Sequence, residues 1–293
     1  MNYSSDHAHE RKPLLTWRQK EILQKILLYT LLTIVALVII LPLVWMLSTS
    51  LKPKSEWFLP QIHWIPLTPT WDNYDKIFNN TTLPILRWFG NSLMVSSIVT
   101  VAILTIDSLA AYAYARMEFR GKRLLFRLLL LTLFLPGLMF LVPNFLTVAS
   151  LGLINTYAGV IVPGLAGVFG VFFMRQFFES LPRELEEAAY IDGATRVQTF
   201  LYIALPLSKP ALATLGIITF LGSWNDFLWP LLILKDRNML TLPPGLRTLQ
   251  GAYTSEYGQM MAGAVITAVP VLLLYIFLQR YVVESVQTTG LKG

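Results

Sequence analysis

Six apolar runs, each near the length of a membrane-spanning helix, constrain this chain more than any other feature of its sequence. A bilayer core about 30 Å thick needs roughly 20 consecutive apolar residues in a helix. Only 14% of the 293 residues are charged, whereas about a quarter are charged in soluble proteins. The sequence therefore predicts an all-α membrane protein with six transmembrane helices, at 26–47, 89–115, 124–149, 156–173, 210–234 and 261–281.

These runs predict one transmembrane domain over 26–284, between an N-terminal segment 1–25 and a C-terminal tail 285–293. The first run is not typical of a cleaved signal peptide, because it is too long and no small-x-small cleavage site follows it. The loop 48–88 holds four of the eight tryptophans, a residue type that favours the membrane interface.

The distribution of lysine and arginine predicts the orientation of the spans. Sixteen of the 23 basic residues fall on one side, in the N-terminal segment, the stretch 116–127, the loop 175–209 and the end of the chain from Arg280 onward. Loops rich in Lys and Arg stay in the cytoplasm. Both termini and the loop 175–209 are therefore expected to be cytoplasmic, and the tryptophan-rich loop is expected to face outward.

The loop 175–209 contains a polar stretch with strong helix signals. Acidic residues at 184, 186 and 187 suit the positive end of a helix, and Gly193 suits the left-handed position after one. Thr195 and Gln198 then have capping-box spacing for a second helix. The stretch predicts a helix, a glycine turn and a second helix. On periodicity alone, such an amphipathic pair is usually a solvated loop.

The same stretch resembles the EAA signature of ABC importer permeases, with every signature position matched at the right spacing. In that family the loop is a coupling helix that docks into a groove on a separate ATP-binding subunit. The resemblance implies a docking and coupling role for Glu187, Ala188, Ala189, Asp192, Gly193, Ile203, Leu205 and Pro206.

Further segments are similar to carbohydrate-type permeases of the maltose type, and the resemblance covers the chain beyond about residue 20. They are Ser50-Leu51-Lys52, the segments 69–74 and 111–116, Trp224-Asn225-Asp226-Phe227 and the end Gly290-Leu291-Lys292-Gly293. The resemblance implies a bacterial inner-membrane complex with a second permease, two ATP-binding subunits and an external solute-binding protein. By the same analogy, the outer loop 238–260 faces the binding protein, through Leu242, Pro243, Pro244, Gly245 and Tyr253.

The sequence lacks the motifs of an enzyme acting alone. It contains no G-x-x-x-x-G-K-[ST] phosphate loop, no H-E-x-x-H and no G-x-S-x-G, and it has no cysteine. We therefore predict no catalytic, cofactor-binding or metal-binding residue in this chain. ATP and magnesium are expected to be used by the partner ATPase.

Polar residues inside the spans are candidates for a solute path, because ionisable groups are costly in hydrocarbon. Asp107 is either a path or gate residue, or a helix-packing contact that reaches toward Tyr112 and Arg116. The segment Trp224-Asn225-Asp226-Phe227 joins an indole to an amide and a carboxylate, a set that suits a polyhydroxylated solute. Its alternative role is to hold a helix kinked near Pro230 against its neighbour.

The predicted function is ATP-driven import of a sugar or related polyol by alternating access, with this chain as a permease subunit. Other readings stay open. An ion-coupled secondary transporter would use Asp107 and Asp226, the acidic residues inside the spans. A channel, a non-transporting receptor subunit, or an ABC permease for a phosphorylated polyol or an amino acid would also fit six spans.

Overall fold

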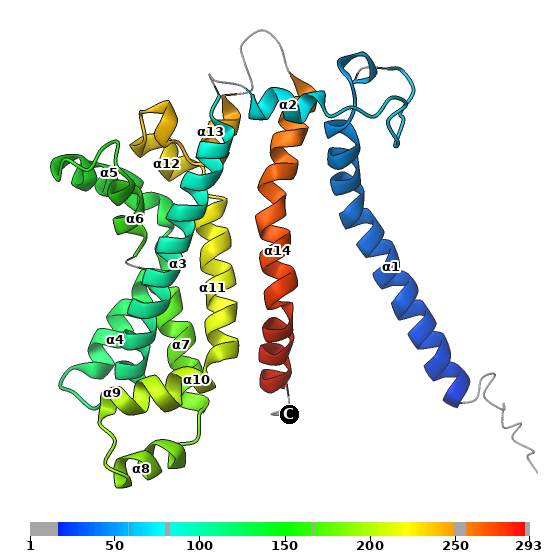
Figure 1. Ribbon diagram of the computed structural model, residues 1–293. Coiled ribbons are helices and arrows are strands. Elements are labelled where there is room, and N and C mark those ends of the chain that lie inside the picture. Colours follow the sequence, from blue (N-terminus) through cyan, green and yellow to red (C-terminus); the bar gives the residue numbers. More distant parts are fainter. Residues whose placement is uncertain (1–16, 58, 80–82, 166, 249–255, 291–293) are drawn as a thin grey trace, which may run out of the picture.

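Helices form all the regular secondary structure in the part of the chain that the computed structural model describes (Figure 1). That part comprises residues 17–57, 59–79, 83–165, 167–248 and 256–290. Three of its helices are long and apolar enough to cross a membrane unbroken. They are α1 (Trp17–Ser50), α3 (Ile85–Arg116) and α14 (Tyr257–Gly290).

The other predicted spans are bent or divided, and up to six spans result if each bent pair of helices crosses once. The third predicted span consists of α4 (Lys122–Leu131), η2 (Thr132–Phe134), η3 (Gly137–Phe140) and α5 (Leu141–Ser150). Its two halves meet at 98°. The bend falls at Leu135, which has extended backbone angles, because the ring of the following Pro136 disfavours a helical conformation there.

The fourth and fifth predicted spans are also interrupted. The fourth contains α6 (Tyr157–Gly164) and α7 (Phe169–Ser180), so the helix runs further than the predicted end at residue 173. The fifth contains α11 (Lys209–Trp224) and α12 (Leu228–Ile233), separated at residues 225–227. Between them lie α8 (Glu184–Ile191), α9 (Arg196–Thr199), a π-helical turn η4 (Phe200–Ala204) and α10 (Leu205–Leu207).

Helix α3 is the centre of the fold, since both α7 and α11 pack along it and α11 also packs against α14. One apolar cluster surrounds Tyr112, Phe178 and Phe200 at the end of α3 near α8. A second surrounds Trp88 and Trp224 toward its other end. Helix α1 contacts α14 near its C-terminal end and then diverges from it (Figure 1), and nearly all its side chains before Ser48 are exposed, as expected of a face that meets lipid.

The loop between α1 and α3 ties the end of α1 to the start of α14. It carries η1 (Lys54–Glu56) and α2 (Asp72–Phe78). The side-chain amide of Asn73 donates to the carbonyls of Ser50 and Lys52, at 2.9 Å each. Gly258 of α14 packs so closely on Asn73 and Trp57 that a Cβ would collide with both. Two further short helices, η5 (Arg237–Met239) and α13 (Leu242–Arg247), pack against α3.

Candidate functional sites at the helix tip and in the membrane

Helix α8 forms a tip that projects beyond the ends of the long helices (Figure 1). Its first turn contains three acids, Glu184, Glu186 and Glu187, which complement the positive end of the helix dipole. The glutamate before Ala188 is exposed, as is Ala188 itself, and Ala189 is half-buried. The signature residues at this tip therefore lie on accessible surface.

A glycine turn ends α8 as the sequence predicts. Gly193 has a φ of +85°, and the amide of Ala194 donates to the carbonyl of Ala189 at 2.9 Å. The amide of Gly193 donates to Tyr190, which completes a Schellman motif. No atom lies within 4 Å of a Cβ built on Gly193, so the backbone conformation, and not lack of space, requires glycine.

The predicted capping box is confirmed at the start of α9. The Thr195 amide donates to the side-chain oxygen of Gln198 at 2.8 Å, and the Gln198 amide donates to the Thr195 hydroxyl at 3.3 Å. This reciprocal pair fixes where the second helix begins, directly after the glycine turn. The chain then bends by 77° before α11.

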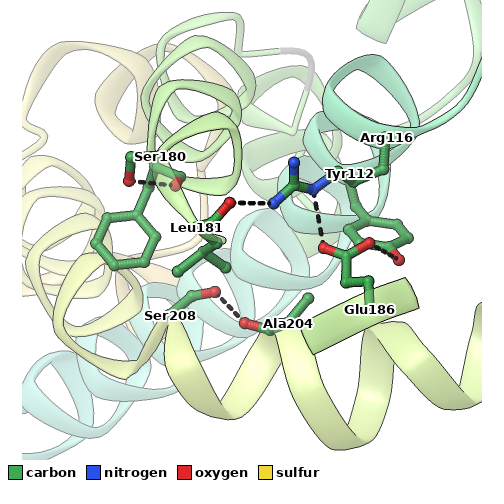
Figure 2. A network of polar contacts seen from close by, with 8 residues as sticks. Tyr112, Arg116, Ser180, Leu181, Glu186, Ala204 and Ser208 are labelled. Atoms are coloured by element: carbon green, nitrogen blue, oxygen red, sulfur yellow. Dashed lines mark hydrogen bonds and ion pairs between the residues drawn. The ribbon is translucent and has the colours of Figure 1, made fainter. Parts of the chain in front are cut away.

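A buried polar network holds α8 on α3 (Figure 2). The Arg116 guanidinium donates from Nε to Glu186 Oε1 at 2.8 Å and from Nη2 to the Leu181 carbonyl at 2.8 Å. The Tyr112 hydroxyl donates to Glu186 Oε2 at 3.1 Å. The side chains of Arg116 and Glu186 are only 6% and 8% exposed. Both carboxylate oxygens are therefore satisfied, and α8 is fixed to the end of α3.

Sequence reasoning did not find this network. Glu186 precedes the signature by one residue, and Arg116 lies 70 positions away on another helix. The sequence did place Tyr112 and Arg116 near Asp107, but no hydrogen bond joins Asp107 to either of them in the described part of the chain. No local pattern reveals a pair so far apart in sequence.

The surface beside the network is apolar and exposed. Ile191, Val197 and Tyr202 are 86%, 66% and 75% exposed. Ile203 and Leu205 are half-buried, Pro206 is exposed, and Asp192 caps the end of α8. Ala204 and Ser208 are fully buried instead, so they attach this segment to the bundle.

A cavity of about 410 Å³ lies within the helical body, between α3, the bent third span, α6, α11 and α12. Asn144, Thr219, Ser223 and Asp226 provide its polar groups, and Asp226 is the one charged residue in its lining. The amide of Trp229 donates to Asp226 Oδ1 at 3.3 Å. The cavity has the size and mixed lining typical of small-molecule sites.

The four residues Trp224 to Phe227 separate in the structure. Trp224 is fully buried, stacks on Phe220 and donates to the Thr267 carbonyl at 3.2 Å. Asn225 caps α11 and is exposed. Phe227 lines a different hollow beside α13. Of the four, Asp226 alone lines the cavity, and Trp224 packs inside the helical body.

Asp107 is also buried in the described structure. It is 2% exposed, and its Oδ2 atom has no hydrogen-bond partner. Its carboxylate lies against the backbone of Gly170 on α7, where a Cβ would collide with it. Asp107 does not line the 410 Å³ cavity.

The outer-loop residues predicted to face a binding protein are largely buried. Leu242 donates its amide to Ser92 Oγ at 2.7 Å, and Gly245 packs directly on the Trp88 indole. Pro244 is buried and Pro243 is half-buried. Tyr253 lies outside the described residues. These side chains anchor α13 to α3, and their role toward a binding protein stays a prediction.

Comparison with known proteins agrees with these features. Residues 107–287 match the family described as binding-protein-dependent transport system inner membrane component. The arabinooligosaccharides transport system permease protein AraQ of Halalkalibacterium halodurans is 40% identical over 88% of this chain and 93% of its own length. The trehalose/maltose transport system permease protein MalG of Thermococcus litoralis is 31% identical over 94% of this chain and 99% of its own.

A solved structure shares the fold. A chain of a bacterial ABC transporter that imports the acidic polysaccharide alginate superposes with a TM-score of 0.79 at 24% identity, over 92% of this chain and 100% of that one. The fold and the sequence thus define a helical transport permease. This chain belongs to the family of inner-membrane components of binding-protein-dependent transport systems. The predicted resemblance, the all-α membrane fold and the role as an importer permease are confirmed, whereas the count of six spans stays a prediction.

Proposed function

We propose that this chain is one of two permease subunits of an ATP-driven importer for a neutral, polyhydroxylated solute such as an oligosaccharide. The observation that carries the proposal is the exposed α8 tip on its buried attachment to α3. A docking helix must present free surface to a partner and still be held rigidly by its own chain. Glu187, Ala188 and Ile191 provide the surface, and Arg116 and Tyr112 provide the attachment.

The partner at this tip is a separate ATP-binding subunit, because the chain contains no phosphate loop of its own. ATP-driven closure of two such subunits would move each tip as a rigid lever. The Arg116–Glu186 pair passes that motion to α3, and the continuous path from α9 through α10 passes it to α11. Both helices line the cavity, so its access would alternate between the two sides.

The lining of the cavity supports a neutral cargo. Asn144, Thr219 and Ser223 can exchange hydrogen bonds with hydroxyl groups, and the Trp229 side chain can contact the face of a sugar ring. A carboxylate at Asp226, with no basic residue in the lining, would repel phosphate or uronate groups. The solutes named for the two permease relatives are uncharged saccharides.

The basic residues favour a cytoplasmic tip and cytoplasmic termini. In this orientation the outer loop and α13 face the side where an external binding protein delivers solute. A companion permease would cover part of the exposed apolar helix surface and complete the solute path. These assignments of orientation and partners belong to the proposal.

Reconstituted uptake tests the proposal. The chain would be purified with its companion permease, ATP-binding subunits and binding protein, and placed in proteoliposomes. We expect ATP-dependent uptake of a labelled neutral oligosaccharide and no uptake of a uronate oligosaccharide of equal length. Uptake that continues without ATP and stops with a protonophore would instead establish an ion-coupled transporter.

A variant at the turn tests the lever. Proline cannot adopt a φ near +85°, so Gly193→Pro should leave membrane insertion intact but separate ATP hydrolysis from uptake. Normal uptake by this variant would disprove a rigid lever at α8. Gly90→Ala serves as the control, because it adds a methyl group in open space. Gly90→Pro would not serve, because proline would break α3.

A further inference from the structure

A basic recess lies between α4 and α7, away from both sites described above. Two adjoining hollows of about 620 Å³ and 200 Å³ share Lys122, Arg123 and Arg175 in their linings. Arg127 completes the lining of the smaller one. One acid, Glu118, lines the larger hollow, and no acid lines the smaller. The recess therefore concentrates positive charge.

The charges in this recess are only partly neutralised. Lys122 pairs with Glu118 at 3.0 Å, and Arg175 pairs with Glu179 at 2.6 Å. Arg123 and Arg127 pair with no carboxylate in the described part of the chain. Residues four apart share a helix face, and like charges at this spacing repel each other. A bound anion would relieve this repulsion.

Aromatic rings form the wall of the smaller hollow. The Arg175 guanidinium lies 3.9 Å from the centre of the Phe126 ring, and its Nε has no hydrogen-bond partner. Tyr114 also lines this hollow and contacts Phe126, with ring centres 5.3 Å apart. The stacking orients one cation of the recess.

The adjoining face of α4 is apolar and exposed, and its Leu124 also lines the larger hollow. Leu124, Leu128 and Leu131 are 62%, 51% and 59% exposed. Acyl chains would cover such a face. The recess thus places unpaired arginines directly beside surface suited to lipid tails.

We propose that this recess binds the phosphate headgroup of an anionic phospholipid. Basic pockets between transmembrane helices on the cytoplasmic side suit such headgroups, and arginine forms strong paired hydrogen bonds with phosphate oxygens. Arg123 and Arg127 hold the phosphate, Lys122 lies at its rim, and the leucine face of α4 contacts the acyl chains. A free phosphate shares the headgroup chemistry but has no use for the adjoining leucines.

Native mass spectrometry of the intact transporter in lipid nanodiscs tests the site, with phosphatidylglycerol and phosphatidylcholine as probes. The wild type should retain phosphatidylglycerol in preference to phosphatidylcholine. The double variant Arg123→Gln/Arg127→Gln should lose that preference by roughly 30-fold, since each basic residue near the surface contributes about a factor of five. The double variant Arg123→Lys/Arg127→Lys keeps the charge and should retain most of the preference.

Arg120→Gln is the matched control, because Arg120 is exposed on the loop just before α4 and lines neither hollow. An equal loss in this variant would assign the effect to general surface charge and overturn the site. Full retention in the double glutamine variant would overturn it too. Release of the lipid by millimolar inorganic phosphate would identify a soluble anion as the ligand and overturn the lipid assignment.

Discussion

Two buried carboxylates beside α3 show opposite ways of placing an acid inside this protein. Glu186 comes from α8 and meets Arg116 and Tyr112, so both its oxygens are hydrogen-bonded. Asp107 lies nine residues before Arg116 on α3 itself and its carboxylate lies against the backbone of Gly170, with Oδ2 unpartnered. Both carboxylates are almost inaccessible to water.

Glu186 therefore links α8 to α3, whereas Asp107 only contacts its neighbour. A buried ion pair stabilises little in itself, but the loss of one partner leaves a buried charge uncompensated. The Glu186 pair therefore makes the position of α8 depend on α3. Asp107 makes no such pair, so its removal disturbs packing alone. We expect stability to fall strongly when the Glu186 carboxylate is neutralised and only weakly when the Asp107 carboxylate is neutralised.

Glu186→Ala should have the largest effect. It strands the Arg116 guanidinium in a buried site, and breaking a buried pair in this way costs about 3–5 kcal/mol. We expect a lower unfolding temperature for the purified permease complex and loss of coupled uptake. Thermal unfolding in detergent, followed by intrinsic tryptophan fluorescence, measures the first effect.

Glu187→Ala is the matched control, since the adjacent glutamate is exposed and its carboxylate has no hydrogen-bond partner in the described part of the chain. It should leave the unfolding temperature unchanged and weaken association with the ATP-binding subunit. The double variant Glu186→Ala/Arg116→Leu should recover part of the stability, because it removes the stranded charge. Equal unfolding temperatures for the two alanine variants would refute the network as a link.

The Asp107 contact responds to size rather than charge. Gly170→Ala introduces a Cβ that collides with the Asp107 carboxylate, and overpacking of this kind costs typically 1–3 kcal/mol. Asp107→Asn keeps the shape and should change stability by less. The double variant Gly170→Ala/Asp107→Ala should be more stable than Gly170→Ala, since the shortened side chain makes room. Additive losses in this cycle, measured by thermal unfolding, would exclude direct contact.

The segment from α8 to α9 shows where sequence reasoning succeeds. The helix, glycine turn and capping box of α8 and α9 depend on residues within a few positions of one another, so spacing alone predicts them. The role of Glu186 depends on a residue 70 positions away, and nothing near Glu186 in the sequence encodes it. The residues of the segment Trp224 to Phe227 suit either a solute or a packing role, and only the fold shows that Trp224 is buried against Phe220 and Phe89.

The predicted spans show the same limit. Hydropathy predicted the unbroken helices α1, α3 and α14, and bent or divided helices occupy the third, fourth and fifth apolar runs. It did not predict that the third run turns by 98° at Leu135, or that residues 225–227 interrupt the fifth. Apolar content reports burial in lipid, whereas a bend depends on one proline and on the helices that pack around it.

The turn after α8 gives a smaller effect than the network beneath it. Gly193→Ala forces a residue with a Cβ into the left-handed region, which costs about 1–2 kcal/mol. No steric clash adds to this, because the space beside Gly193 is open. Gly90→Ala is the control, since Gly90 has open space but a helical conformation. Loss of stability in both variants alike would argue against a conformational cause.

The loop between α1 and α2 provides the smallest effect. Its Glu56 extends the comparison to a carboxylate near the surface. The Thr68 hydroxyl donates to Glu56, as do the amides of Leu67 and Thr68, at 3.0 and 2.9 Å. The hydroxyl contributes most to holding the pKa of Glu56 below its usual range. A lowered pKa in the folded state means that the stabilisation is complete above the usual glutamate pKa. It is lost as the pH falls through the lowered value.

Hydrogen exchange of the segment 64–71, compared between the wild type and Glu56→Gln at each pH, measures this loss. At neutral pH the wild type should exchange more slowly at Leu67 and Thr68, because the ionised carboxylate accepts from both amides. The difference should shrink as the pH falls and the carboxylate gains a proton. Thr68→Val should move this transition to higher pH, since it removes the donor that lowers the pKa most. A difference that stays constant with pH would show that Glu56 holds the loop by its shape, as Asp107 does in α3, and not by its charge.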